Sequence, residues 1–156
     1  THKTSSAASD VYKRQPSHDL DSAEAIGEFV KRFYAKLLDD PLLSPVFLQT
    51  ADIDIETHLP RIEAFWRKLL LRETGYDRHM MNIHRQIHQR HEFTAEHFQR
   101  WLHHFDATLD EHYSGRYSER ARYLGHSIAR NLQEALLKPG DFSQRTRYIE
   151  DRAPFN

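Results

Sequence analysis

Four side chains in this sequence combine an aromatic ring with a hydrogen-bonding atom at positions where a solvated helix would carry lysine or glutamate. They are Tyr34, His58, His84 and Trp101. Each falls on a separate predicted helix, at or beside the apolar face of that helix. A bundle that brings a phenol, an indole and two imidazoles to one interior space would form an apolar pocket with a few placed polar groups. Such a pocket is typical of a binding site.

Hydrophobic periodicity predicts the first two helices of this bundle. One starts at Asp21, with Glu24 completing a capping box, and ends at Asp39-Asp40-Pro41. The next carries His58, and we expect Pro60 near its start because an interior proline would break the helix. Its predicted buried stripe consists of Ile62, Phe65, Trp66, Leu69 and Leu70.

Three further helices are predicted after these two. A short, histidine-rich helix covers residues 78–89 and carries His84. A longer helix has Thr94 as its N-cap, carries Trp101 and stops at Ser114-Gly115. The last covers residues 118–137. Since no long stretch alternates with period two, the sequence predicts an all-α fold of about five substantial helices.

The length of 156 residues suits one domain. Residues 1–20 are rich in serine, lysine and aspartate, lack the apolar core of a secretory signal, and are predicted to be a disordered tail. Residues 21–138 are predicted to form the domain, and residues 139–156 a C-terminal extension. We have no functional interpretation of either terminal segment.

Composition excludes several classes of function. The formal charge of −1 argues against nucleic acid or an anionic membrane as the main partner, and no apolar run approaches the ~20 residues of a membrane span. Cysteine is absent, which removes disulfides and thiolate chemistry and weakly favours a cytoplasmic location. The sequence contains no GxSxG, GxxxxGK[ST] or HExxH motif, which argues against the usual types of hydrolase, P-loop NTPase and zincin.

The histidines leave alternatives open at this level. His84 and His88 are four residues apart and share a helix face, so with His91 or Glu92 they could form a zinc or nickel site. They could equally belong to a solvent-facing cluster of histidines. Tyr34 and Trp101 could be ordinary core residues, in which case the protein would be a helical interaction module without a cofactor.

Taken in order, these residues resemble the truncated haemoglobins of group III over residues 24–137. The resemblance rests on an ordered set of short segments: Phe33-Tyr34-Ala-Lys, Asp40-Pro41, Ser44-Pro45-Val46-Phe47, His58 eight residues before Trp66, Tyr76 and Met81 ahead of His84, and His97-Phe98-Gln-Arg-Trp101-Leu102 followed by Phe105.

The resemblance implies a truncated globin fold, a two-over-two helical sandwich around haem b. It implies that His84 is the proximal ligand of the haem iron, with His88 as an alternative one turn later. It implies distal, ligand-facing roles for Tyr34, His58 and Trp101, of which His58 could also bind the iron when no ligand is present. The implied cofactor-binding walls are Phe47, Ile62, Phe65, Trp66 and Phe98. Arg61, Lys68, Arg85 and Arg90 are the candidates for pairing the haem propionates.

The function that follows is binding of dioxygen or another diatomic ligand such as NO or CO. Three distal donors would hold a polar ligand tightly, which favours nitric oxide detoxification or peroxide chemistry over carriage. An enzymatic role would need a reductase partner, because the sequence contains no flavin or nicotinamide motif. A gas sensor is a further alternative, and the oligomeric state is not predicted.

Overall fold

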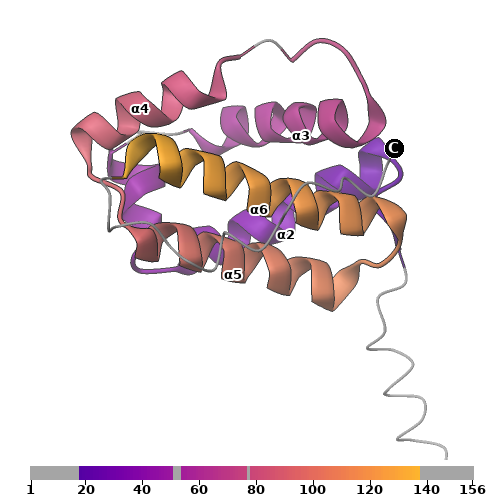
Figure 1. Ribbon diagram of the computed structural model, residues 1–156. Helices are drawn as coiled ribbons and strands as arrows, with labels where there is room; N and C mark the ends of the chain where they lie inside the picture. The colour runs from indigo at the N-terminus through magenta and orange to yellow at the C-terminus, as the bar shows by residue number, and fades with distance from the viewer. Residues whose placement is uncertain (1–17, 51–53, 77, 138–156) are drawn as a thin grey trace, which may run out of the picture.

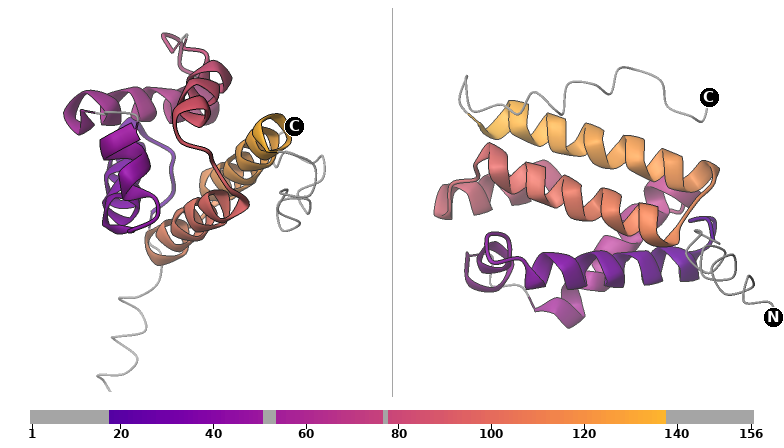
Figure 2. Two further views of the ribbon diagram at one scale, coloured as in Figure 1. Left: turned by 90° about the vertical axis from the view of Figure 1, so that its left-hand side faces the viewer. Right: turned by 90° about the horizontal axis from the view of Figure 1, so that it is seen from below.

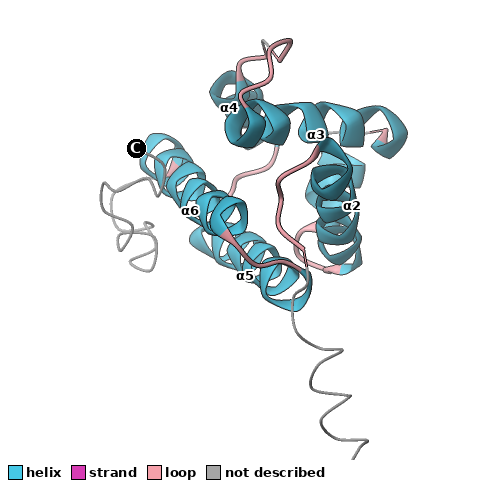
Figure 3. Ribbon diagram, turned by 90° about the vertical axis from the view of Figure 1, so that its right-hand side faces the viewer, coloured by secondary structure: helices cyan, strands magenta, loops and turns pink. Residues whose placement is uncertain are grey.

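Helices dominate the computed structural model, which describes residues 18–50, 54–76 and 78–137 (Figures 1 and 3). Five α-helices are present in these ranges: α2 (Ala23–Asp39), α3 (Ile55–Leu71), α4 (Met80–Arg90), α5 (Ala95–His112) and α6 (Arg116–Leu136), with a π-helical segment, η1 (Val46–Thr50), before α3. No strand occurs within these ranges, only an isolated bridge between His18 and Tyr113. The all-α prediction is confirmed.

The helices form two packed pairs. α2 packs against α3, α5 packs against α6, and α2 also contacts α5, which joins the pairs. Figure 2 shows α5 and α6 running side by side with α2 next to them. This is the two-over-two arrangement predicted above. α4 follows a loop after α3 and contacts mainly α6, at the edge of the molecule (Figure 1).

An aromatic cluster joins the two pairs. Phe29 of α2 makes edge-to-face contacts with Trp66 at 6.4 Å between centroids and with Phe105 at 5.4 Å. Phe105 is fully buried, and a Cβ placed on Gly125 would lie 2.6 Å from its ring. The glycine therefore lets α6 approach α5 closely, which seats the Phe105 ring between the pairs.

Helix ends follow local hydrogen bonding, and here the predictions need small corrections. The N-cap of α2 is Ser22 rather than Asp21, because its hydroxyl accepts the N–H of Ala25 at 3.1 Å. Thr94 caps α5 as predicted, in a capping box whose second member is His97. α6 starts two residues before the predicted position 118.

Two further expectations were placed imprecisely. Pro60 is the sixth residue of α3, so the helix begins a full turn before it. Residues 18–20 were assigned to the tail, but Leu20 is fully buried in the core. The Asp19 carboxylate accepts the N–H groups of Tyr117 and Ser118 at the start of α6. The ordered domain therefore includes these residues, while predictions for 1–17 and 139–156 lie outside the described residues.

Candidate functional site

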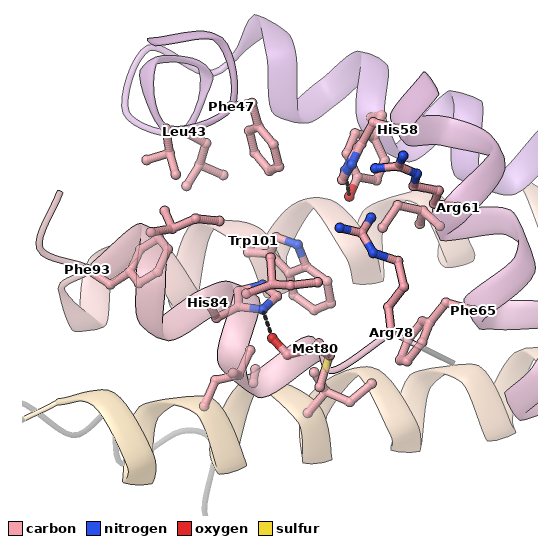
Figure 4. A pocket seen from close by; sticks show the side chains of 18 of the residues that line it. Leu43, Phe47, His58, Arg61, Phe65, Arg78, Met80, His84, Phe93 and Trp101 are labelled. Carbon is pink, nitrogen blue, oxygen red and sulfur yellow. Dashed lines mark hydrogen bonds between the residues drawn. The ribbon is translucent and has the colours of Figure 1, made fainter. Parts of the chain in front are cut away.

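A cavity of about 540 Å³ lies between α3 and α4 and is backed by α5 and α6 (Figure 4). Eight of the residues predicted to bind a cofactor or ligand line it together with His84: Tyr34, Phe47, His58, Ile62, Phe65, Trp66, Phe98 and Trp101. Most of the remaining wall is aliphatic or aromatic. The tertiary structure thus brings together residues that are up to 67 positions apart, between Tyr34 and Trp101.

Tyr34 and His58 form a polar pair on the α2–α3 side of the cavity. The Tyr34 hydroxyl and His58 Nε2 lie 3.1 Å apart and share one hydrogen bond, whose direction depends on the imidazole tautomer. The rings meet edge to face at 5.3 Å, and Phe47 packs on Tyr34 at 5.6 Å. Two hydrogen-bonding groups are therefore held at one point of an apolar wall.

Both groups are uncharged near neutral pH. Burial, followed by the nearby Tyr76, raises the pKa of Tyr34 well above its ordinary value. Burial lowers the pKa of His58 to about 4, and the charges of Arg78 and Arg61 add to the shift. A neutral phenol and a neutral imidazole can each donate one hydrogen bond. This side of the cavity therefore offers donors without a fixed charge.

His84 lies on α4, across the cavity from His58 (Figure 4). Its Nδ1–H donates to the carbonyl of Met80 at 2.8 Å, one turn back on the same helix, and burial lowers its pKa. This hydrogen bond fixes the tautomer, so the Nε2 lone pair is free. A neutral imidazole oriented by a carbonyl at its other nitrogen is how metal-ligating histidines are usually held.

His88 does not line the cavity. Its Nδ1 accepts the backbone N–H of Phe93 at 2.9 Å, and its ring stacks on Phe93 at 5.7 Å with 13° between planes. Its contacts belong to the α4–α5 connection. Between His84 and His88, only His84 faces the interior space shared with Tyr34 and His58.

Trp101 reaches the cavity from α5. Its indole stacks on Phe105 at 5.2 Å with 12° between planes and meets Phe33 edge to face at the same separation. These contacts restrict the ring, which is half-buried. The indole nitrogen has no hydrogen-bond acceptor in the described part of the chain, and an indole can only donate.

Arginines are the cations of the cavity lining. Arg61, Arg78 and Arg90 line it and are exposed, and Figure 4 shows Arg61 and Arg78 beside His58. Of the four cations named from the sequence, Lys68 and Arg85 do not line the cavity. Lys68 instead donates to the carbonyl of Tyr76 at 3.1 Å.

Tyr76, Arg78 and His97 are among the lining residues that the sequence did not assign to the site. Tyr76 packs edge to face on Phe65 at 5.4 Å. Arg78 stands two residues before α4, a position that a search for cations flanking the predicted short helix would have found. His97 is only 7 % exposed and accepts the N–H of Thr94 at its Nδ1; its capping position gave no sign that it also lines the cavity.

The alternative of a zinc or nickel site finds no support in the geometry. Within residues 18–50, 54–76 and 78–137, no group of three or more His, Cys, Asp or Glu side chains converges as metal ligands would. His84 and His88 engage different surroundings, as described above. The arrangement instead offers the Nε2 lone pair of His84, which faces neutral donors across an apolar space with cations among its lining residues.

The fold that surrounds this cavity is similar to that of the truncated globins. Comparison with known proteins gives a more specific likeness: the chain is 28% identical over 120 residues to the group 3 truncated hemoglobin of Campylobacter jejuni, covering 75% of this chain and 92% of that protein. The crystal structure of the group III truncated hemoglobin from that organism has a TM-score of 0.68 at 27% identity and covers 76% of this chain and 94% of its own. No family model matches the chain. The predicted resemblance to group III truncated haemoglobins is confirmed in both sequence and fold.

No helix of the described residues has the length and apolar character needed to cross a bilayer.

Proposed function

We propose that this protein binds haem b in the α3–α4 cavity, with His84 as the axial ligand, and holds a diatomic ligand on the opposite side. The observation that supports this most directly is the state of His84. Its Nδ1–H is committed to the Met80 carbonyl at 2.8 Å, which leaves Nε2 as a lone pair in an apolar cavity. His88, the alternative ligand, has its Nδ1 engaged by Phe93.

The cavity fits the proposed cofactor in volume, in the flatness of its walls and in the charge of its lining. Its volume of about 540 Å³ falls within the range of roughly 300–1,000 Å³ typical of cofactor and ligand pockets. The flat walls that Phe47, Phe65, Trp66 and Phe98 provide suit an apolar disc, whose burial adds to the core at about 25 cal/mol per Å². Arg61 and Arg78 are the cations that we propose for the two carboxylates, since both are exposed lining residues.

When bound, haem would supply an iron centre able to bind diatomic ligands and to exchange electrons. The residues on the far side from His84 would set ligand preference. Tyr34 and Trp101 offer an O–H and an N–H, and His58 shares its hydrogen bond with Tyr34. Each donor would stabilise a polar ligand by about 1–2 kcal/mol, which corresponds to a roughly five- to thirtyfold slower release.

Slow release favours a redox role over carriage, and we propose nitric oxide detoxification with bound oxygen or peroxide chemistry as the reaction class. Both need protons and donors at the ligand, which the neutral Tyr34–His58 pair can supply or accept. A simple oxygen carrier, a gas sensor and a cofactor-free interaction module are the alternatives. The cytoplasmic location stays a prediction.

Absorption spectroscopy on purified protein titrated with hemin tests the proposal. We expect a red protein with a strong band near the blue edge of the visible and an imidazole-ligated iron. His84→Ala should lose that ligation, and added free imidazole should restore it. The matched control is His88→Ala, one turn away, which should keep the spectrum of the unaltered protein.

Two outcomes would contradict the proposal. A folded protein that takes up no hemin would favour the cofactor-free interaction module. A His84→Ala variant with an unchanged imidazole spectrum would move the axial role to another histidine. His58→Ala should change ligand release while haem stays in place, which separates a distal role from that of a main anchor.

A further inference from the structure

Charge is distributed unevenly around the cavity. Between Arg78 and Arg90 the sequence has three arginines and no aspartate or glutamate. α5, by contrast, carries four carboxylates (Glu96, Asp106, Asp110 and Glu111) and one arginine, Arg100. Because the whole chain has a formal charge of −1, the cations beside the cavity form a local excess rather than part of a basic protein.

Among the described residues, the cations beside the cavity have no carboxylate partner. Arg61, Arg78, Arg85 and Arg90 are all exposed, and none of them lies within ion-pair distance of a carboxylate in the part of the chain that the structure describes. We call these four residues the arginine surface. Two of them, Arg85 and Arg90, lie on α4, which has no buried residue and lies at the edge of the molecule (Figure 1).

On the other helices, several charged side chains pair with one another. Representative ion pairs are Lys36–Glu111 at 3.0 Å, Arg100–Asp40 at 3.0 Å and Arg122–Asp106 at 3.1 Å. These pairs cancel much of the local potential, whereas the arginine surface keeps its own. The lowered pKa of His58, due to burial first and then to Arg78 and Arg61, is consistent with a positive potential at the cavity.

Haem carboxylates would not remove this excess. On the proposed function, two carboxylates would pair with Arg61 and Arg78, and Arg85 and Arg90 would stay uncompensated. Arg85 does not line the cavity at all, so cofactor binding gives no reason for it to be unpaired. A surface that stays positive around the exposed edge of a redox cofactor suits a negatively charged partner.

We propose that the arginine surface docks an acidic electron-donor protein, of the flavodoxin or ferredoxin class, beside the open edge of the cavity. This inference rests on the proposed function, because it assigns the source of electrons for the bound iron. The partner would pass one electron to ferric iron, which becomes ferrous while the donor's flavin or iron–sulfur centre is oxidised by one electron. No bond forms between the two proteins, and no proton is needed at the iron.

A small acidic protein fits this surface better than an extended polyanion does. Four arginines, one on α3, one just before α4 and two on α4, can steer a transient encounter, which needs only a small interface. The carboxylates of α5 and the overall charge of −1 would repel a nucleic acid that ran past this patch. Binding to DNA or RNA is therefore an alternative outcome that the test must separate.

Stopped-flow reduction of the hemin-loaded ferric protein by a dithionite-reduced two-iron ferredoxin tests the inference. We expect the second-order rate constant to fall as ionic strength rises. Arg85→Glu should lower it about three- to tenfold at low salt, with convergence at high salt. Lys31→Glu on α2 is the matched control, since it makes the same charge change at an exposed residue away from the cavity.

Neutral reduced lumiflavin serves as a second donor, and it should reduce Arg85→Glu and the unaltered protein at the same rate. Equal loss with both charge reversals, or no loss with either, would overturn the inference while leaving haem binding intact. So would DNA or RNA binding that depends on Arg85 without any effect on ferredoxin. If the protein took up no hemin, the proposed function itself would be contradicted. Hemin uptake is therefore measured before any electron donor is added.

Discussion

The two sides of the molecule stabilise themselves differently. α2 and α5 bury aromatic and aliphatic side chains against each other and against α3 and α6, with Phe29, Leu37, Phe105 and Leu109 fully inaccessible to solvent. α4 buries none of its residues, although its apolar face, which includes Ile83 and Ile87, lines the cavity. The core around α2 and α5 is filled by protein side chains alone. The α4 side presents an apolar wall of the cavity, which a bound group would cover.

The largest expected effect on the free energy of unfolding comes from a substitution in the core around α2 and α5. Phe105→Ala should lower the free energy of unfolding by about 3–5 kcal/mol, because the ring contacts Phe29, Trp66 and Trp101 and would leave a cavity. Urea denaturation measures this loss, which should be similar with and without hemin. Ile87→Ala provides the contrast and should cost less than about 1 kcal/mol without hemin and more with it. If Ile87→Ala lowered the free energy of unfolding equally with and without hemin, the proposed difference between the α4 side and the core would be contradicted.

Hemin itself should stabilise the α4 side. At a free concentration 100 times its dissociation constant, it should add about 2.7 kcal/mol to the free energy of unfolding. Hydrogen exchange should show new protection in α4 (Met80–Arg90) and little change in the middle of α5. Uniform protection over both helices would mean that the cofactor stabilises the whole fold rather than completing one side.

A third test concerns the junction between the two pairs of helices. Asp40 is 5% exposed and accepts hydrogen bonds from His104 at 2.7 Å and Arg100 at 3.0 Å. Burial alone would raise the pKa of Asp40, but hydrogen bonds from His104, Leu42, Arg100 and Leu43 outweigh it and hold the pKa at about 2.

Because the folded pKa of Asp40 lies below the unfolded value of 3.8, the carboxylate contributes stability above about pH 4 and loses it as pH falls toward 2. Asp40→Asn should therefore lower the free energy of unfolding at pH 7 by about 2 kcal/mol, and the difference from the unaltered protein should shrink below pH 4. Denaturation curves at several pH values measure it. A constant difference down to pH 2 would show that the carboxylate charge is not responsible.

The smallest expected effect concerns the donors that we propose to face the ligand. In hemin-loaded protein, Tyr34→Phe should speed ligand release five- to thirtyfold, or about 1–2 kcal/mol. The ratio should stay constant from pH 5 to 8, because the pKa of His58 is about 4 and its imidazole stays neutral there. Flash photolysis or stopped-flow displacement measures these rates. A ratio that changes between pH 6 and 7 would indicate an imidazole that titrates at its ordinary pKa.

The neutral His58 also makes stability depend on pH. Its folded pKa of about 4 lies below the ordinary value of 6.5, so the unfolded chain takes up a proton before the folded one does. The titration of His58 therefore leaves the free energy of unfolding unchanged above about pH 6.5 and lowers it as pH falls from there toward 4. His58→Gln should remove this part of the pH dependence, which provides a control for the release experiment.

Sequence periodicity was sufficient to predict the helices, because local patterns of apolar residues determine where helices form. The apolar spacing in α2 and α5 predicts two amphipathic helices, and Thr94 marks the start of one of them. It was less reliable at boundaries, as Ser22 and residues 18–20 show. Leu20 carries no local signal of burial, since the contact that covers it comes from distant parts of the chain.

The candidate site divides in the same way. Residue types and order were enough to name Tyr34, His58 and Trp101, because polar aromatic groups on apolar helix faces are unusual. They were not enough to distinguish His84 from His88, which share a helix face at a spacing of one turn. In the structure His84 lines the cavity, whereas His88 does not and accepts the backbone N–H of Phe93 at its Nδ1. A contact made through a loop leaves no trace in helical periodicity.

By itself, the sequence determined an all-α chain with the polar aromatic residues of a candidate binding pocket, because helix period and side-chain chemistry are local properties. Only the tertiary structure decided which imidazole nitrogen faces the cavity, which arginines line it and which cations lack a carboxylate partner. These depend on how α3, α4 and α5 come together, and the distances between groups remote in sequence are set by packing rather than by the residues alone.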